Sequence, residues 1–230
     1  MRFADLKYVV VGSKKWNKRV FNEKISKFPG TWYFFDELNQ LDDNLLNDIK
    51  PKYIFFLHWS SIVPDKLLEN FECVCFHMTD VPYGRGGSPL QNLILSGHRK
   101  TKMTALKMTH ELDAGPVYLK EELSLEGGAE EIYIRATLLS AEMIKKIIET
   151  DLSPAPQYGN VVKFKRRNPS QSKIPSSLSL CQHYDFIRML DAEGYPHAFF
   201  EHNGFRYEFR RATLYDKQII SDVKITKIEE

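Results

Sequence analysis

A histidine and an aspartate stand in the two segments of this sequence that are best suited to acid–base chemistry. His77 ends the apolar run 73–77, and a Gly/Pro-rich stretch, 78–89, follows it. Asp113 lies in a second short turn, just before Gly115-Pro116. An imidazole titrates near neutral pH, and a neighbouring carboxylate can orient it or stabilise its charge. The two side chains therefore predict an acid–base pair, provided that the fold brings them together.

The elements around these residues predict an α/β fold. Apolar runs of strand length alternate with stretches of helical spacing along the first 150 residues. The expected strands are 8–11, 31–35, 53–57, 73–77, 104–108 and 117–125, and the expected helices are 15–28, 38–49, 64–71, 90–95 and 130–150. Strands separated by such helices favour an open, mostly parallel, Rossmann-like sheet with crossover helices. Ligands bind such sheets outside the carboxyl ends of the strands, where we expect His77 and Asp113.

The composition changes after residue 150. Four prolines and the basic run Lys163-Phe164-Lys165-Arg166-Arg167 fall within residues 151–177, which predicts a linker. The pattern then restarts, with an expected helix at 184–191 and alternating segments at 199–200, 205–209 and 212–215. We therefore expect a catalytic domain over 1–150, a linker over 151–177 and a small α+β subdomain over 178–230.

The composition limits the kinds of molecule that the protein is expected to bind. The 32 Lys and Arg residues oppose 30 Asp and Glu, a net charge of +2, which gives no electrostatic footprint for nucleic acid. Cys73 and Cys75 are spaced C-x-C with no second pair, so no zinc site is expected. No apolar run approaches the length of a membrane span. These observations predict a cytoplasmic protein with no metal, no membrane partner and no nucleic-acid partner.

The two site segments together resemble the formyltransferases that use N10-formyltetrahydrofolate. That family carries His-x-Ser-Leu-Leu-Pro-x-x-x-Gly and, further along, Leu-Asp-x-Gly. Here the first motif appears as His77-Met78-Thr79-Asp80-Val81-Pro82 with Gly86, and the second as Leu112-Asp113-Ala114-Gly115. The histidine, proline, glycine and acid match, whereas Thr79-Asp80-Val81 replaces Ser-Leu-Leu. The resemblance covers roughly residues 1–150.

Two further segments refine this resemblance. Residues 184–188 and 195–199 look like the C-terminal part of nucleotide-sugar formyltransferases, and residues 77–92 look closest to the pseudaminic-acid type. The resemblance implies formyl transfer from N10-formyltetrahydrofolate to the amine of a nucleotide-linked sugar, such as a UDP-linked 4-amino-4,6-dideoxy sugar, in surface-glycan biosynthesis. His77 would then move protons or stabilise the oxyanion. Asp113 would orient and charge His77 or relay the proton of the amine.

The resemblance also implies binding residues. The pterin ring of the folate would lie between two walls: one formed by Leu57, His58 and Trp59, the other by Glu111, Leu112 and Asp113. A diphosphate could rest at the start of the first helix, because helix N-termini bind anions. The residues expected there are Gly12, Ser13 and Lys14, with Arg85 and Gly86 from the Gly-rich loop. No G-x-G-x-x-G pattern accompanies them, so a dinucleotide site is not expected.

One departure from the family pattern leaves alternatives open. The resemblance implies an asparagine two residues before the histidine, on the same strand face, but this chain has Cys75, and a thiol is a weak donor. Either His77 and backbone N–H groups hold the oxyanion, or Asn92 swings in, or activity is reduced or lost. Cys75 therefore leaves open an inactive folate- or nucleotide-sugar-binding module. The enzyme alternatives are an aminoacyl-tRNA formyltransferase and a glycinamide-ribonucleotide formyltransferase, and the aromatic-rich tail argues against the second.

Two further features of the sequence each allow two interpretations. The run 163–167 could contact RNA phosphates or could simply be part of the linker. The short chain and its balanced charge argue against a tRNA substrate. The aromatic residues of the tail could form a sheet core or the interface of a homodimer.

Overall fold

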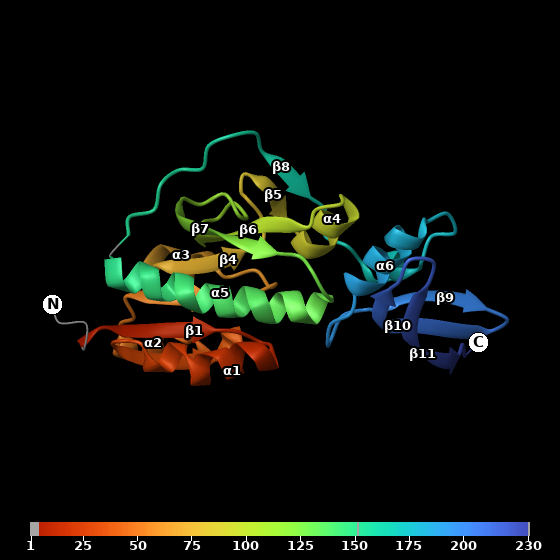
Figure 1. The fold of residues 1–230 in the computed structure, drawn as a ribbon. Helices are drawn as coiled ribbons and strands as arrows, with labels where there is room; N and C mark the ends of the chain where they lie inside the picture. The colour runs from red at the N-terminus through yellow and green to blue at the C-terminus, as the bar shows by residue number, and fades with distance from the viewer. Residues whose placement is uncertain (1–4, 151, 230) are drawn as a thin grey trace. The chain divides into compact units, whose positions relative to one another are not determined.

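The computed structural model describes residues 5–150 and 152–229; residue 151, where the predicted linker begins, lies outside the described residues. Figure 1 labels the main elements. In chain order they are β1 (Lys7–Val11), α1 (Lys15–Glu23), η2 (Ile25–Lys27), β2 (Thr31–Phe35), η3 (Leu38–Gln40), α2 (Asp43–Ile49), β3 (Tyr53–Phe56), α3 (Asp65–Asn70), β4 (Cys73–His77), β5 (Tyr83–Gly86), α4 (Pro89–Leu95), β6 (Lys100–Lys107), β7 (Val117–Ser124), α5 (Ala129–Thr150), β8 (Val162–Phe164), η4 (Pro169–Ser172), α6 (Leu180–Arg188), β9 (Ala198–His202), β10 (Phe205–Leu214) and β11 (Ile219–Lys227).

A six-stranded sheet in the order β2-β1-β3-β4-β6-β7 forms the centre of the fold. The pairs β1–β2, β1–β3 and β3–β4 are parallel, whereas β4 and β6 are antiparallel. The predicted α/β class with an open, mostly parallel sheet is therefore confirmed. The reversal at β6 was not expected, and it changes how the site is assembled.

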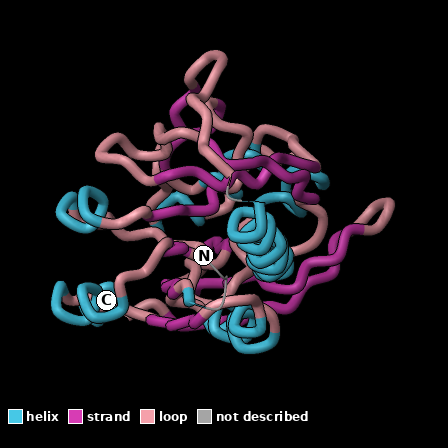
Figure 2. The backbone as a smooth tube through the Cα atoms, turned by 90° about the vertical axis from the view of Figure 1, so that its left-hand side faces the viewer, coloured by secondary structure: helices cyan, strands magenta, loops and turns pink. Residues whose placement is uncertain are grey.

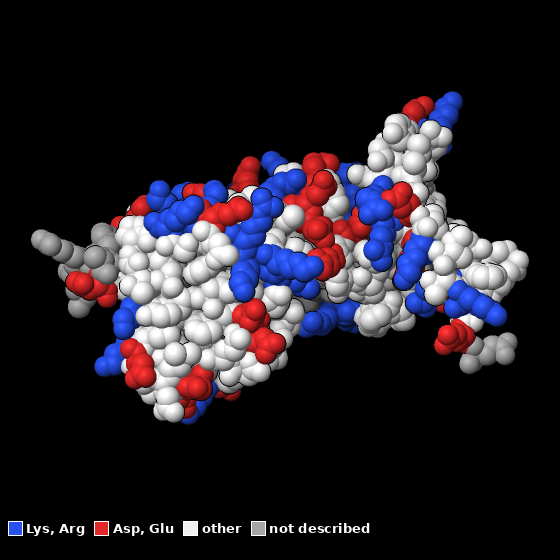
Figure 3. All heavy atoms as spheres, turned by 90° about the horizontal axis from the view of Figure 1, so that it is seen from below, with Lys and Arg blue, Asp and Glu red and all other residues white. Residues whose placement is uncertain are grey.

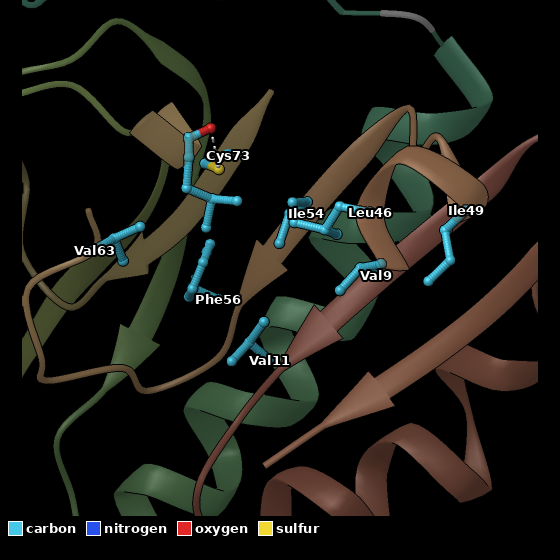
Figure 4. Close-up of a cluster of buried hydrophobic side chains, with 9 residues drawn as sticks. Val9, Val11, Leu46, Ile49, Ile54, Phe56, Val63 and Cys73 are labelled. Atoms are coloured by element: carbon cyan, nitrogen blue, oxygen red, sulfur yellow. Dashed lines mark hydrogen bonds between the residues drawn. The ribbon is translucent and has the colours of Figure 1, made fainter. Parts of the chain in front are cut away.

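Helices cover both faces of this sheet, which buries its apolar strands. On one face, Leu46 and Ile49 of α2 and Leu67 of α3 pack against alternate residues of the strands. These belong to a cluster that also contains Val9, Val11, Ile54, Phe56, Val63 and Cys73 (Figure 4). Elsewhere α1 and α5 are joined by a hydrogen bond from Asn17 to Thr137 (3.2 Å). Figure 2 shows helices on both sides of the strands.

The described chain divides into two compact units that do not follow single cuts in the sequence. The first comprises 1–86, 102–123 and 134–163, apart from the undescribed positions, and contains His77 and Asp113. The second comprises 87–101, 124–133 and 164–230, again as far as it is described. It contains the antiparallel sheet β11-β10-β9, so the predicted antiparallel C-terminal sheet is confirmed. The predicted boundaries at 150 and 177 stay a prediction.

Three strands lie where none was predicted. β5 has the sequence Tyr-Gly-Arg-Gly, which carries no strand pattern, and it exists because β8 pairs with it. β11 alternates polar and apolar residues over 222–226, a strand pattern that the sequence prediction did not use, and most of its residues are exposed. Within residues 5–150 and 152–229, no helix has both the length and the apolar character that crossing a membrane requires. Positive and negative side chains are interspersed on the face that Figure 3 shows.

The core predicts a clear stability difference between two isoleucines. Ile54 is fully buried in β3, whereas Ile62 is 80% exposed. Ile54→Ala should lower the free energy of unfolding by about 2–5 kcal/mol, because it removes buried surface and leaves a cavity. Ile62→Ala should change it by no more than about 0.5 kcal/mol. Urea denaturation of both variants measures the difference, and equal effects would contradict this packing.

Candidate active site

His77 and Asp113 lie together in the first unit. The Nδ1 atom of His77 is 3.5 Å from Oδ1 of Asp113, and the two side chains are only 9% and 10% exposed. His77 is the last residue of β4, as predicted. The second carboxylate oxygen of Asp113, Oδ2, accepts a hydrogen bond from the backbone N–H of Gly86 (2.9 Å). The structure therefore brings together the two residues that the sequence predicts as a pair.

The other ring nitrogen of His77 fixes which atom can take up a proton. Nε2 lies 2.8 Å from the carbonyl oxygen of Gly84. A carbonyl oxygen only accepts hydrogen bonds, so Nε2 carries the proton. In the neutral imidazole Nδ1 is then unprotonated and faces Asp113. A proton arriving at Nδ1 would be stabilised by the carboxylate, which is the arrangement that a general base requires.

The turn that carries Asp113 reaches His77 by an unexpected path. Because β6 runs antiparallel to β4, Lys107 lies opposite Val74, and the N–H of Met108 bonds to the carbonyl of Cys73. The end of β6 thus lies beside the start of β4, four residues or about 13 Å before His77. The expectation that both residues follow carboxyl ends at one sheet edge is wrong, and the turn must fold back along β4.

Two backbone features make this turn possible. Asp113 has φ of +54°, a left-handed conformation that non-glycine residues adopt at a cost. A Cβ atom on Gly115 would overlap the carbonyl oxygen of Lys107, so only glycine fits there. The Leu-Asp-x-Gly spacing is therefore required by the close approach of the turn to β6.

Cys75 occupies β4 two residues before His77 and pairs with Leu106 of β6. Burial, together with the charge of Asp113, raises the pKa of its thiol above the ordinary range. The thiol is therefore neutral at physiological pH. The predicted substitute, Asn92, uses its amide to donate to the carbonyls of Gly87, Ser88 and Lys165, so its N–H groups are engaged at the start of α4.

The loop after β3 contains the three residues predicted to line one side of the folate. Leu57 is fully buried, and its N–H bonds to the carbonyl of Val11 (2.8 Å). His58 has φ of +48°, and burial and the nearby charge of Lys14 lower its pKa to about 4. The indole Nε1 of Trp59 is buried without a hydrogen-bond partner in the described protein. That orphaned donor is a place where a bound ligand could supply an acceptor.

The opposite predicted wall is more exposed. The side chain of Glu111 is 62% exposed and lies 3.6 Å from Arg85 and 3.7 Å from Lys163. Leu112 is 58% exposed. Both positions are open to a ligand, and of this wall only Asp113 is buried. Their roles in binding stay predictions.

The residues predicted to hold a diphosphate form the turn before α1. The N–H of Lys14 donates to Oδ1 of the buried Asn17 (3.0 Å), which caps this helix start. A Cβ on Gly12 would lie 2.7 Å from Cβ of Asn17, so Gly12 allows that packing. Ser13 is exposed between them. These contacts explain the sequence locally and leave an anion-binding role for the turn a prediction.

Arg85 and Gly86 both form hydrogen bonds to other residues of the protein. The guanidinium of Arg85 donates through Nε (3.1 Å) and Nη2 (2.9 Å) to Oε1 of Gln157. The N–H of Gly86 is taken by Asp113. Gln157 is the residue that the sequence analysis missed. It stands in a Pro-rich segment interpreted as linker, and nothing in its local pattern indicates that it reaches the site.

The chain also matches known proteins in both sequence and structure. The family model described as "Methionyl-tRNA formyltransferase, C-terminal domain" matches residues 169–226. A solved structure, "Methionyl-tRNA formyltransferase from Clostridium thermocellum", is 41% identical, covers 96% of this chain and 99% of its own, and superposes with a TM-score of 0.90. The chain belongs to the formyltransferase family. The resemblance to formyltransferases noted in the sequence is confirmed at this level.

Two further matches, one in sequence and one in fold, cover different shares of the matched proteins. A "Methionyl-tRNA formyltransferase" of Rickettsia massiliae is 34% identical over 109 residues, 46% of this chain and 36% of that protein. The chain thus matches about a third of that curated relative's length. HypX from Aquifex aeolicus, solved in complex with tetrahydrofolic acid, shares the fold with a TM-score of 0.72 at 16% identity, over 89% of this chain and 37% of its own.

These comparisons correct the substrate and the partners predicted from the sequence. The prediction of a nucleotide-sugar substrate and no nucleic acid is wrong, because the relatives with substantial identity are named for methionyl-tRNA. The surface-glycan assignment loses its support for the same reason. The error has a physical source: net charge averages over the whole surface, whereas contact with phosphates depends on local charge.

His58 predicts a pH dependence of stability. Its pKa is about 4 in the folded protein and 6.5 in the unfolded chain, so the unfolded state binds more protons between these values. Stability should therefore fall as the pH drops from 6.5 to 4, by up to about 3 kcal/mol from this residue. Urea denaturation across that range should show a shallower decline for His58→Asn, which tolerates the left-handed backbone. Parallel pH profiles would contradict the assignment.

Proposed function

We propose that this protein transfers a formyl group from N10-formyltetrahydrofolate to the amino group of methionyl-tRNA. The observation that carries the proposal is the buried pair of His77 and Asp113, with Nδ1 and Oδ1 3.5 Å apart, in a member of the formyltransferase family. The names of the relatives support methionyl-tRNA as the acceptor. The alternative of an inactive binding module is disfavoured because both members of the pair are present and in place.

The loop after β3 fits a folate. N10-formyltetrahydrofolate, when bound, supplies the formyl group as an activated carbonyl. The unpartnered Nε1 donor of Trp59 can bond to an acceptor atom of the pterin, and the backbone of the loop can bond to its amide edge. The fold neighbour solved with tetrahydrofolic acid supports the same ligand class.

In this proposal His77 accepts a proton and Asp113 stabilises the charge that results. As the amine nitrogen bonds to the formyl carbon, it must lose a proton, which the facing pair of Nδ1 of His77 and the Asp113 carboxylate can take up. The bond between N10 and the formyl carbon then breaks, and the proton passes to N10, which leaves as the secondary amine of tetrahydrofolate. Once charged, the imidazolium is stabilised by the carboxylate of Asp113. The hydrogen bond from Nε2 to the carbonyl oxygen of Gly84 keeps a proton on Nε2 in both the neutral and the charged ring. Cys75, with its neutral thiol, adds no competing charge to the pair.

The basic run supports a polynucleotide substrate. Lys163, Lys165 and Arg166 are exposed, although the net charge of the chain is only +2. Exposed cations close together in sequence can bind neighbouring phosphates of an RNA backbone. We therefore propose that this run contributes to tRNA binding.

A formylation assay tests the proposal. Purified protein is incubated with N10-formyltetrahydrofolate and methionyl-tRNA, alongside UDP- and dTDP-linked amino sugars, and products are followed by mass spectrometry. We expect a formyl mass gain on the methionyl group. His77→Ala should lower kcat/KM by about 10²–10⁴-fold, because it removes the general base. Asp113→Asn keeps an oxygen for Gly86 but removes the charge, and it should also reduce turnover.

The controls separate binding from chemistry. His77→Ala should retain folate binding by calorimetry, because His77 belongs to neither predicted wall of the folate pocket and its loss leaves the donor of Trp59 in place. An unchanged rate for His77→Ala would rule out the mechanism. Formylation of a sugar but not of methionyl-tRNA would rule out the proposed acceptor.

The basic run yields a separate prediction. Lys165→Ala/Arg166→Ala should weaken binding of tRNA and reduce the slope of log K against log[salt] by about one for each phosphate that the variant no longer binds. Lys145→Ala/Lys146→Ala, which removes the same charge from exposed positions of α5, serves as the matched control. Filter binding at several salt concentrations measures both. Equal weakening in the two double variants would show a general charge effect and no binding at the run.

A further inference from the structure

Gln157 connects the segment after α5 to the turn that carries Asp113. Its neighbour Ala155 forms two backbone hydrogen bonds with Val117, at 2.7 and 2.9 Å, so this segment is fixed against the start of β7. From there the carboxamide reaches two other parts of the first unit, the strand β5 and the Asp113 turn.

Both ends of the carboxamide are fully used. Oε1 accepts two bonds from Arg85, at 3.1 and 2.9 Å. Nε2 donates to the carbonyl oxygens of Asp113 and Gly115, both at 2.8 Å. A guanidinium only donates and a carbonyl only accepts, so the orientation of the amide is determined by its partners. A carboxylate in its place would set one acceptor oxygen, where Nε2 now lies, against the two carbonyl oxygens of Asp113 and Gly115.

These bonds close a ring around Asp113. Gln157 holds the carbonyl of Asp113, while the N–H of Gly86 holds its carboxylate. Gly86 is the chain neighbour of Arg85, which is itself bound to Gln157. The backbone and the side chain of Asp113 are thus tied to the same short strand, and the carboxylate keeps its place beside His77.

The turn requires such a restraint. It leaves β6 beside the start of β4 and folds back to reach the end of β4, and Asp113 holds a left-handed backbone at its tip. A turn in this conformation persists only where its surroundings determine it. A displacement of about 1 Å at a catalytic group can cost about 10²-fold in rate.

We propose that Gln157 is a positioning residue for formyl transfer, acting by holding Asp113 against His77. This inference rests on the function proposed above. Gln157 itself needs no contact with either substrate, so its loss should lower kcat while leaving the KM for N10-formyltetrahydrofolate within about twofold. A residue that only stabilised the fold would leave kcat per folded molecule unchanged.

Two substitutions and a matched control test the proposal in the full chain. Gln157→Met removes both donors and the acceptor at similar size, and Gln157→Glu turns the donor end into an acceptor. Each should lower kcat by about 10- to 100-fold. Gln40→Glu is the control: the Oε1 of Gln40 accepts from the N–H groups of Asp36 and Glu37, which a carboxylate also satisfies. It should leave kcat unchanged.

A double-mutant cycle identifies the path of the effect. If Gln157 acts through Asp113, then adding Gln157→Met to Asp113→Asn should lower kcat no further than Asp113→Asn alone. Independent, multiplicative losses would overturn the proposal, as would wild-type kcat in both Gln157 variants.

Amide hydrogen exchange gives a readout that does not depend on turnover. Exchange in residues 109–116 should rise in both Gln157 variants, with β1 and β3 unchanged. Protection equal to that of the wild type would overturn the proposal even if activity fell. Failure of the wild-type protein to formylate any acceptor would refute the proposed function, and hydrogen exchange would still decide whether Gln157 holds the turn.

Discussion

The carboxylate of Asp113 is the point on which the arrangement of the site depends. One oxygen faces Nδ1 of His77 at 3.5 Å, and the other accepts the N–H of Gly86 at 2.9 Å. The carbonyl of the same residue is bound by Gln157. A buried carboxylate is costly unless hydrogen bonds and a partner compensate for lost hydration. Each of these contacts comes from a different part of the first unit, so their convergence fixes the loop after β4, the turn after β6 and the segment after α5 together.

The antiparallel pairing of β4 with β6 explains why so many contacts are needed. In a wholly parallel sheet, the carboxyl ends of neighbouring strands meet at one edge and loops there need little guidance. Here β6 ends beside the start of β4, and the distance back to His77 is covered by a turn. That path has two local requirements. Position 115 must be glycine because it lies against the carbonyl of Lys107, and Asp113 must adopt a left-handed backbone conformation. They are acceptable because the surrounding hydrogen bonds determine the conformation.

How much of the structure could be predicted from the sequence depends on whether a feature is determined by a local pattern or by contacts between distant segments. Strands 31–35 and 73–77 were predicted at their observed bounds, because buried apolar runs carry a strong local signal. His77 and Asp113 followed from residue type, spacing and the family resemblance. The direction of β6 and the existence of β5 depend on pairing between distant segments, which local patterns do not encode. Gln157 was missed for the same reason: its four hydrogen bonds all go to residues more than forty positions away.

Net charge was a poor guide to the partner, and the structure indicates why. Many of the charges that the composition counts are matched within the protein, such as Lys107 with Glu72 and Lys120 with Asp80. Such pairs contribute to the sum but offer little to a ligand. What a phosphate backbone meets is the set of cations whose side chains reach the surface close together, and the side chains of Lys165 and Arg166 are both exposed. A chain of charge +2 can therefore present a local site for a polyanion, so balance in the composition excludes a dense basic surface but not a nucleic-acid substrate.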